Sequence, residues 1–325
     1  MAGNYSIGVD LGGTKVLAAV VDTKTGRLIA SKKKRTKQAN TQDALLERIS
    51  AAVDEALEQA GLEADEIEGI GVGAAGMVDR QRGILLAAAN IGANDISITK
   101  PLETRYGVRT ELGNDVEVAT YGERYFGAGQ KSKHFVCVFV GTGIGSGIVV
   151  NDSHLKGATG TAGEIGHTKV FPDGRKCGCG GYGCLEAYAS RLAIAKSIKS
   201  AIDHGQETTV ADKIDLTKGI LRSSVLAEAV KRGDPVVLDA VKHGARYLAW
   251  GLASTVNFFN PERIILGGGL IEAVDLYYDT VESELKKIAL PIPSRKLKLV
   301  RSQLGDNAGV VGAAIMASAK NGKSR

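Results

Sequence analysis

The chain has 325 residues, of which 44% are hydrophobic and 24% charged, and this length is enough for two domains with sizeable cores. The formal net charge of +5 is too small to indicate a nucleic-acid partner. The most apolar stretch, residues 135–150, is broken by glycines, so no membrane span is predicted. The first residues lack the charged and apolar regions of a secretory signal, and we therefore expect a cytoplasmic enzyme with reduced cysteines.

Two glycine-rich segments, residues 7–22 and 136–151, share the plan strand, glycine turn, strand. Such hairpins offer bare backbone N–H groups to an anion. Neither segment spells G-x-G-x-x-G or the Walker pattern, and no helix directly follows either turn, which argues against a Rossmann or P-loop protein. Because both turns carry a threonine, the pair favours phosphate binding over simple tight turns. It also predicts an internal duplication, with two related domains facing a cleft.

The rest of the chain alternates helices and strands. A helix is predicted from an N-cap at Asn40 or Thr41 to Gly61, and a short buried strand at residues 67–73. Asp234 and Pro235 predict the start of a long helix that stops before Pro261. A strand at residues 263–266 then runs into three glycines, and a last helix covers about residues 308–319. This order predicts an α/β protein with mixed sheets and crossover helices.

Asp115 lies where a predicted strand ends and a helix begins. Aspartate is a common helix N-cap. A transferable phosphate also needs a hydroxyl acceptor, and a hydroxyl acceptor needs a carboxylate to take its proton. The spacing alone leaves open whether Asp115 caps a helix or acts as the general base.

Three of the four cysteines fall within eight positions, at Cys177, Cys179 and Cys184, and His167 lies just upstream. Three thiolates and one imidazole make a closed tetrahedral zinc set, and disulfides are disfavoured in the cytoplasm. The fourth cysteine, Cys137, is interpreted as a buried strand residue.

Glu164 and Glu186 flank this cysteine cluster. A metal that orders the loop would fix both carboxylates in space, and fixed carboxylates can recognise a polyol. The sequence therefore predicts a structural zinc next to a site that can recognise a polyol.

The ordered set of motifs resembles the ROK sugar kinases (repressors, open reading frames, kinases). Residues 10–15 look like the family's first phosphate loop, residues 141–147 like the second, residues 163–190 like its zinc and sugar signature, and residues 266–269 like the adenosine-side loop. The resemblance covers nearly the whole chain. It implies two actin-like ATPase (ribonuclease H-like) α/β domains around a cleft. The smaller would be residues 1–114 with 304–325, and the larger, residues 115–303, would carry the zinc motif with the sugar and adenosine sites.

The family resemblance also implies an activity: transfer of the γ-phosphate of ATP to the 6-hydroxyl of a hexose, most simply glucose. Asp115 would be the general base. The sugar would be held by Asn90, Asn114, Asp115, Glu164, His167 and Glu186. ATP and Mg²⁺ would be held by Asp10, Gly12, Gly13, Thr14, Lys15, Thr142, Gly143, Gly268 and Gly269, with Asp10 acting on Mg²⁺ through water. His167 would use one ring nitrogen for the structural zinc and the other for the sugar.

Two departures from the family pattern weaken the choice of sugar. The segment at residues 89–95 lacks a tryptophan that many family glucokinases carry, although Asn90 keeps its place. Glu117 stands where the family often has asparagine. N-acetylmannosamine, N-acetylglucosamine, mannose and fructose therefore remain alternatives to glucose.

Two other kinds of protein remain as alternatives. One is a sugar-responsive ROK regulator without kinase activity, although those proteins carry an added helix-turn-helix. Here the first phosphate strand starts at about Tyr5, which leaves no room for one. The other is a sugar-binding protein that has lost catalysis. The expected partners are a hexose and ATP, without nucleic acid or membrane, and the family suggests a homodimer or homotetramer.

Overall fold

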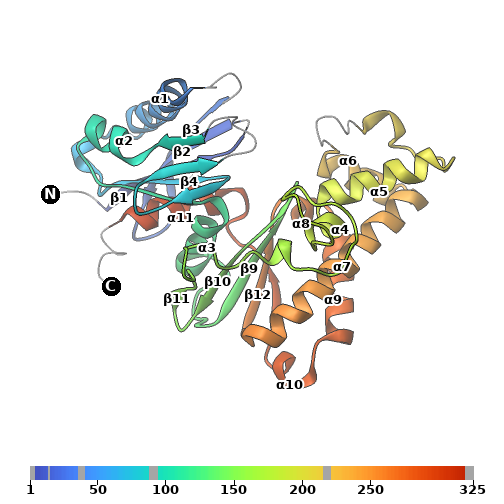
Figure 1. The fold of residues 1–325 in the computed structure, drawn as a ribbon. Helices are drawn as coiled ribbons and strands as arrows, with labels where there is room; N and C mark the ends of the chain where they lie inside the picture. The colour runs from blue at the N-terminus through green and yellow to red at the C-terminus, as the bar shows by residue number, and fades with distance from the viewer. Residues whose placement is uncertain (1–3, 14, 36–40, 88–93, 215–220, 319–325) are drawn as a thin grey trace. The chain divides into compact units, whose positions relative to one another are not determined.

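A computed structural model describes residues 4–13, 15–35, 41–87, 94–214 and 221–318 (Figure 1). Thr14, Asn40 and Asn90, which the sequence analysis singled out, lie outside the described residues. The chain divides into two compact units. The first consists of Met1–Gln130 and Asp306–Arg325, and the second of Lys131–Gly305.

The first unit is built on a five-stranded mixed sheet with the order β3-β2-β1-β4-β8. Its strands are β1 (Tyr5–Leu11), β2 (Lys15–Asp22), β3 (Leu28–Arg35), β4 (Ile70–Ala74) and β8 (Thr110–Asn114). A smaller sheet holds β5 (Met77–Asp79), β6 (Ile84–Ala87) and β7 (Asn94–Ser97). The helices are α1 (Gln42–Ala60), α2 (Thr99–Tyr106), α3 (Asp115–Phe126) and α11 (Ala308–Ala317). β1 pairs antiparallel with β2 and parallel with β4, which in turn pairs parallel with β8.

Helix α1 begins and ends where local chemistry predicts. The Thr41 hydroxyl accepts a hydrogen bond from the Ala44 N–H at 3.3 Å, which satisfies one of the free amides at the helix start. Gly61 ends the helix in the left-handed conformation, with a φ of 66°. Ile49 and Val53 lie on the buried face of the helix, in one core cluster with Val9 of β1. The predicted helix is therefore confirmed.

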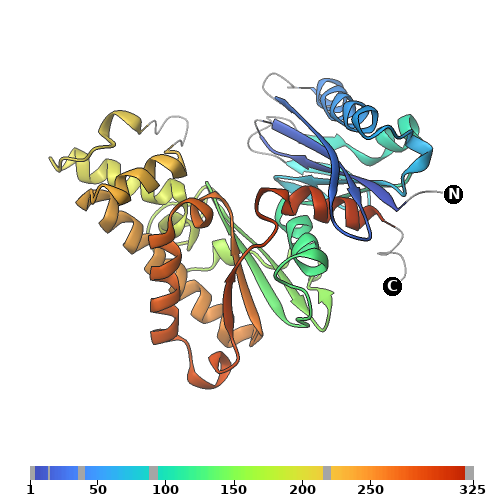
Figure 2. The same cartoon turned by 180° about the vertical axis from the view of Figure 1, so that it is seen from behind.

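Helix α11 lies against the same sheet and against α3, as seen from behind in Figure 2. Its approach to the strands is unusually close. A Cβ built on Gly8 would lie 1.8 Å from the Val310 carbonyl oxygen, and one on Gly71 would lie 1.8 Å from that of Ala313. These small residues let the helix backbone rest almost directly on the strands, which explains the alanine- and glycine-rich composition seen in the sequence.

We expect Gly71→Ala to destabilise the protein by more than about 2 kcal/mol, because the new methyl group cannot fit without moving α11 off the sheet. The matched control is Gly12→Ala in the same unit, where the added Cβ meets only the Lys15 carbonyl oxygen at 3.4 Å. Urea unfolding followed by circular dichroism would measure both. Equal midpoints for the two variants would contradict the close-packing argument.

The second unit repeats the plan of the first with the strand order β11-β10-β9-β12-β13. Its strands are β9 (Phe135–Val140), β10 (Ile144–Val150), β11 (Ser153–His154), β12 (Arg263–Gly267) and β13 (Lys298–Arg301). β9 pairs antiparallel with β10 and parallel with β12, as β1 does with β2 and β4. The match of order and direction confirms the predicted internal duplication and the mixed α/β class.

The helices of the second unit are α4 (Glu186–Ala189), α5 (Arg191–Asp203), α6 (Ser223–Lys231), α7 (Pro235–Phe259), α8 (Gly269–Ala273), α9 (Asp275–Ile288) and α10 (Pro291–Ser294). The Asp234 carboxylate caps α7 by accepting a hydrogen bond from the Val237 N–H at 3.1 Å. Asn260 ends that helix in the left-handed conformation, directly before Pro261. The start and end predicted for this helix are confirmed.

The unit boundary differs from the one expected from sequence. The expected division at residues 114 and 115 falls inside the first unit, which runs to Gln130 and so includes α3. Packing explains why: a Cβ on Gly312 of α11 would lie 1.6 Å from the Val118 carbonyl oxygen of α3. The two helices therefore form one body with the first sheet. In the described parts of the chain, no helix is long and apolar enough to cross a membrane.

Candidate active site

In the first unit, the polar residues predicted for the site lie at one edge of the sheet. The parallel register places Leu11 opposite Ala74, and Ala74 opposite Asn114. Asp10 and the glycine turn after β1 therefore lie near the ends of β4 and β8, where Asp115 begins α3. The carboxyl ends of parallel strands are where α/β sheets bind ligands. The strand register thus brings Asp10 and Asp115 to the same edge.

Asn114, and not Asp115, caps helix α3. The Asn114 side-chain oxygen accepts hydrogen bonds from the N–H groups of Val116 at 2.9 Å and Glu117 at 3.3 Å, and its amide nitrogen donates to the Gly76 carbonyl at 3.1 Å. The Asp115 carboxylate accepts a hydrogen bond from the adjacent Val116 N–H at 3.0 Å and also interacts with the Asn114 side chain. The cap of α3 is therefore Asn114, and the Asp115 carboxylate does not serve as the cap.

The pKa of Asp115 is raised to about 6, mainly because burial disfavours the charged carboxylate and further because of the nearby negative charge of Asp10. The pKa of Asp10 is raised as well, mainly by burial, with the Asp306 charge adding to it and the charges of Lys15 and Lys33 opposing it. A carboxyl group with a pKa near 6 is ionised at neutral pH and still holds a proton well once it has taken one. That balance suits a general base.

Glu117, the unusual residue of this segment, is held in an ion pair. Arg80, just after β5, lies 2.8 Å from the Glu117 carboxylate and 3.6 Å from that of Glu111. All three side chains are largely buried. These pairs tie β8 and α3 to the segment after β5, and they give Glu117 a structural role that the sequence did not reveal.

In the second unit, two predicted nucleotide motifs lie side by side at the equivalent sheet edge. Phe139 pairs with Gly267 across β9 and β12. A Cβ on Gly268 would therefore lie 2.7 Å from the Val140 carbonyl oxygen, and Gly268 has a φ of 89° that favours glycine. The turn with Thr142 and Gly143 and the loop with Gly268 and Gly269 are thus adjacent, although they are far apart in sequence.

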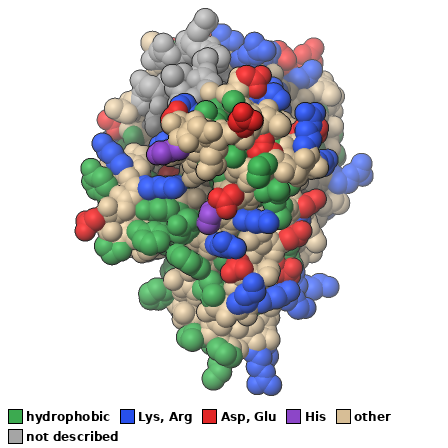
Figure 3. Space-filling model, turned by 90° about the vertical axis from the view of Figure 1, so that its right-hand side faces the viewer, with side chains coloured by type: hydrophobic (Ala, Val, Ile, Leu, Met, Phe, Trp, Pro, Cys, Tyr) green, Lys and Arg blue, Asp and Glu red, His purple; other side chains and the backbone are tan. Residues whose placement is uncertain are grey.

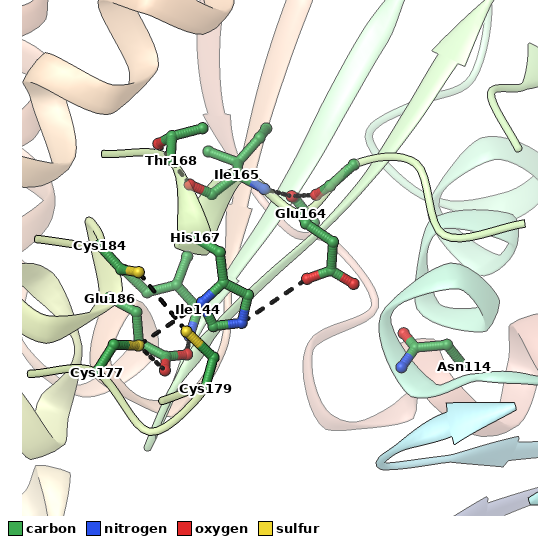
Figure 4. A network of polar contacts seen from close by, with 12 residues as sticks. Asn114, Ile144, Glu164, Ile165, His167, Thr168, Cys177, Cys179, Cys184 and Glu186 are labelled. Carbon is green, nitrogen blue, oxygen red and sulfur yellow. Dashed lines mark hydrogen bonds and ion pairs between the residues drawn. The ribbon is translucent and has the colours of Figure 1, made fainter. Parts of the chain in front are cut away.

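The predicted zinc ligands converge on one point (Figure 4). The Nδ1 atom of His167 and the Sγ atoms of Cys177, Cys179 and Cys184 all lie within 4.8 Å of one another. The Cys179 and Cys184 sulfurs are 3.7 Å apart, as are the Cys177 sulfur and His167 Nδ1. A tetrahedral zinc with Zn–S bonds of about 2.3 Å has ligand–ligand edges of about 3.6–3.8 Å. A disulfide would instead need about 2.05 Å between sulfurs. The donor set and its spacing fit zinc.

Lys169 adds a feature that the sequence analysis missed. Its ammonium donates to the Cys184 sulfur at 2.9 Å. Zinc with three thiolates and one neutral imidazole carries a net charge of −1. The positive charge of Lys169 would neutralise this net charge. A single lysine carries no motif that would have identified it in the sequence.

His167 links the metal cluster to Glu164. Its Nδ1 atom faces the cysteines, while its Nε2 atom lies 3.9 Å from the Glu164 carboxylate (Figure 4). Glu164 is 65% exposed, so its carboxylate is open to a ligand. One ring nitrogen is therefore positioned for metal and the other faces a polar, accessible group.

Glu186 connects the cluster to the second glycine turn. Its carboxylate accepts a hydrogen bond from the Ile144 N–H at 2.9 Å and lies 3.6 Å from the Cys177 sulfur. A Cβ on Gly143 would lie 2.5 Å from this carboxylate, so the glycine makes room for it. The metal loop and the predicted phosphate turn are joined through one side chain.

Comparison with known proteins shows the family of the chain. Residues 6–320 match the ROK family. A glucokinase of Streptomyces coelicolor is 36% identical over 316 residues, which are 96% of this chain and 97% of the relative. The crystal structure of a ROK family glucokinase from Streptomyces griseus, in complex with glucose and AMPPNP, has a TM-score of 0.80 and 35% identity, and the match covers 95% of this chain and 98% of that one.

A regulator also matches. A putative xylose repressor from Caldicellulosiruptor is 30% identical over 95% of this chain, but the match covers 77% of the repressor. The fold with its duplicated sheets, the two glycine hairpins and the Cys₃His cluster define an actin-like sugar-kinase core with a candidate metal site. The chain belongs to the ROK family.

Proposed function

We propose that this protein is an ATP-dependent glucokinase that transfers the γ-phosphate of ATP to the 6-hydroxyl of glucose. The observation that carries the proposal is the Asp115 carboxylate, whose pKa is raised to about 6 and which is not used to cap α3. The full-length match to glucokinases and the neighbour solved with glucose and AMPPNP support the choice of substrates.

The proposed reaction needs a base, a sugar site and a phosphate site. Asp115 would take the proton of the 6-hydroxyl as its oxygen attacks the γ-phosphorus. The side chains of Asn114, Glu164, His167 and Glu186 would hold the other hydroxyls, with Asn90 as a further contact. Carboxylates accept hydrogen bonds from sugar hydroxyls, and the outward Nε2–H of a metal-bound His167 would donate one.

The proposed nucleotide site uses residues of both glycine turns and of the adenosine-side loop. In the first unit these are Asp10, Gly12, Gly13, Thr14 and Lys15, and in the second Thr142, Gly143, Gly268 and Gly269. Asp10 would hold Mg²⁺ through water, since Mg²⁺ prefers oxygen ligands, and the bound ion would neutralise phosphate charge. The zinc, held by His167 and the three cysteines, would be structural, because four protein ligands leave no open position.

The activity should fall as the pH falls through about 6, because Asp115 acts as a base only when ionised. We expect kcat/KM for the sugar to drop about tenfold per pH unit below that value. A raised folded-state pKa means that protonation of Asp115 stabilises the fold, so this loss is not caused by unfolding at Asp115. Rates from pH 5 to 8 with circular dichroism at each pH would check this. A flat profile with the fold intact would contradict it.

A sugar panel separates the proposed function from its alternatives. ADP release would be measured with glucose, mannose, fructose, N-acetylglucosamine and N-acetylmannosamine at equal concentration. Glucose should give the highest kcat/KM. A higher value for another sugar would change the substrate but keep the kinase. Sugar binding without turnover on any of them would favour the regulator class, to which the repressor match belongs.

We further propose that the enzyme works in the cytoplasm as a homodimer or homotetramer, with glucose and ATP as its partners and without nucleic acid. Large hydrophobic side chains on the surface of the second unit support self-association: Trp250 is 44% exposed, Phe258 84% and Ile292 87%. Figure 3 shows hydrophobic side chains gathered on one face of the molecule. Light scattering coupled to gel filtration would give the mass, and a monomer at micromolar concentration would contradict this assembly.

A further inference from the structure

Arg191, the first residue of α5, joins the two nucleotide motifs of the second unit. Its backbone N–H donates to the Gly141 carbonyl at 2.9 Å, and its guanidinium Nη2 donates to the Thr142 hydroxyl at 2.8 Å. The other terminal nitrogen, Nη1, donates to the Ser223 hydroxyl at 3.4 Å. Ser223 lies beside the adenosine-side loop, since a Cβ on Gly269 would be 3.7 Å from its hydroxyl. The guanidinium therefore spans from the phosphate turn to that loop.

The charge of Arg191 has no counter-ion in the part of the chain that the structure describes. Its Nε atom is buried and makes no hydrogen bond there, and no carboxylate pairs with its guanidinium there. Arg80, also largely buried, shows the usual solution, with carboxylates of Glu117 and Glu111 at 2.8 and 3.6 Å. Accordingly, burial lowers the pKa of Arg191, whereas the carboxylates beside Arg80 raise its pKa despite burial. A half-buried guanidinium without an anion is costly unless a ligand supplies one.

The hydrogen bonds of Arg191 leave donors for such a ligand. Guanidinium has five N–H donors, and each Nη atom uses one of its two on a hydroxyl. The Thr142 hydroxyl, which accepts from Arg191, is free to turn its own hydrogen toward the same ligand. Thr142 is exposed at the turn. The planar guanidinium is held in place next to a hydroxyl and the backbone amides of the glycine turn. This set of donors suits the oxygens of a phosphate chain.

We propose that Arg191 binds the α- and β-phosphate oxygens of ATP, an assignment that rests on the proposed kinase function. Its position between the phosphate turn and the adenosine-side loop selects the phosphates nearest the nucleoside. Arg191 would bind the phosphates of ADP as well as those of ATP. It would not contribute to the binding of adenosine, which lacks phosphates.

The test is direct titration of ATP, ADP and adenosine into Arg191→Gln, Arg191→Lys and the unaltered protein, without sugar. Charge-assisted hydrogen bonds of this kind correspond to about 10- to 100-fold in affinity. We expect Arg191→Gln to lose that factor for both ATP and ADP, with adenosine binding unchanged. Arg191→Lys keeps the charge but not the fork and should lie between the two. Arg232→Gln, which removes an exposed arginine paired with Glu228, is the control for net charge and should bind all three normally.

Each outcome decides the assignment. An equal loss of adenosine affinity in Arg191→Gln would show that Arg191 only holds the two loops together. Unchanged ATP and ADP affinities, or an unaltered protein that binds no ATP, would also overturn it. Failure of this assignment can be distinguished from failure of the glucokinase proposal, because the titrations contain no sugar. If the unaltered protein phosphorylates no hexose but Arg191→Gln still weakens nucleotide binding, the assignment of Arg191 stands and the glucokinase proposal fails.

Discussion

Asp115→Asn should lower kcat by about 10²- to 10⁴-fold while the KM for sugar changes only a few-fold, because proton removal is lost and positioning is kept. The amide is close in shape to the carboxylate, and the cap of α3 is provided by Asn114, so the helix start should be unaffected. Coupled measurement of ADP release at saturating sugar and ATP would give kcat.

The same substitution should stabilise the fold. The pKa of Asp115 is raised from its ordinary value of 3.8 to about 6, so ionising this group at pH 7 costs the folded state up to about 3 kcal/mol. Asparagine removes the charge and with it that cost. A protein that becomes more stable as it loses turnover is the pattern of a residue kept for chemistry.

Glu117→Gln is the matched control, since it neutralises a carboxylate on the same helix. Its partner Arg80 would lose the shorter of its two carboxylate contacts and keep the longer one to Glu111, so the variant should be less stable. Its kcat should stay within about threefold of the unaltered enzyme, because Glu117 has no proposed part in the reaction. If Asp115→Asn retained more than about half of the original kcat, Asp115 would not be the base.

The sequence predicted those features whose causes are local. Helices α1 and α7 were predicted at both ends because Thr41, Gly61 and Asp234 act on amides and carbonyls a few residues away. The metal cluster could be predicted because three of its ligands fall within eight positions, and short glycine-rich spacing forces them together. The duplicated hairpins were recognisable because each glycine turn is flanked by its own two strands.

Features that depend on distant contacts were not predictable. Asn114 and Asp115 are both good caps, and only the backbone conformation at Asn114 decided between them. The unit boundary beyond α3 follows from Gly312 resting on Val118, two residues far apart in the chain. Arg191 is an ordinary arginine at a helix start in the sequence. That no carboxylate of the described residues pairs with its charge is visible only when its neighbours are known.

The largest stability effect should come from the metal site. Purified protein should contain about one zinc per chain, and Cys179→Ser should lose most of it, because hydroxyl is a poor replacement for a thiolate ligand. Metal binding free energy counts toward folding, so we expect a loss of at least about 3 kcal/mol. Chelation of the unaltered protein should have the same effect, and elemental analysis with thermal unfolding would measure both.

Loss of zinc should also weaken sugar binding. A metal that stabilised only its own loop would not have this effect. His167 belongs to the cluster and Glu186 contacts it, so without the metal the side chains proposed to hold the hydroxyls lose their fixed positions. We expect glucose affinity to fall about 10- to 100-fold, as for other groups that orient a ligand shell. Cys137→Ala, at the buried cysteine of β9, is the control and should keep its zinc and its glucose affinity. Active protein without zinc, or Cys179→Ser that binds glucose normally, would overturn the link between the metal and the sugar site.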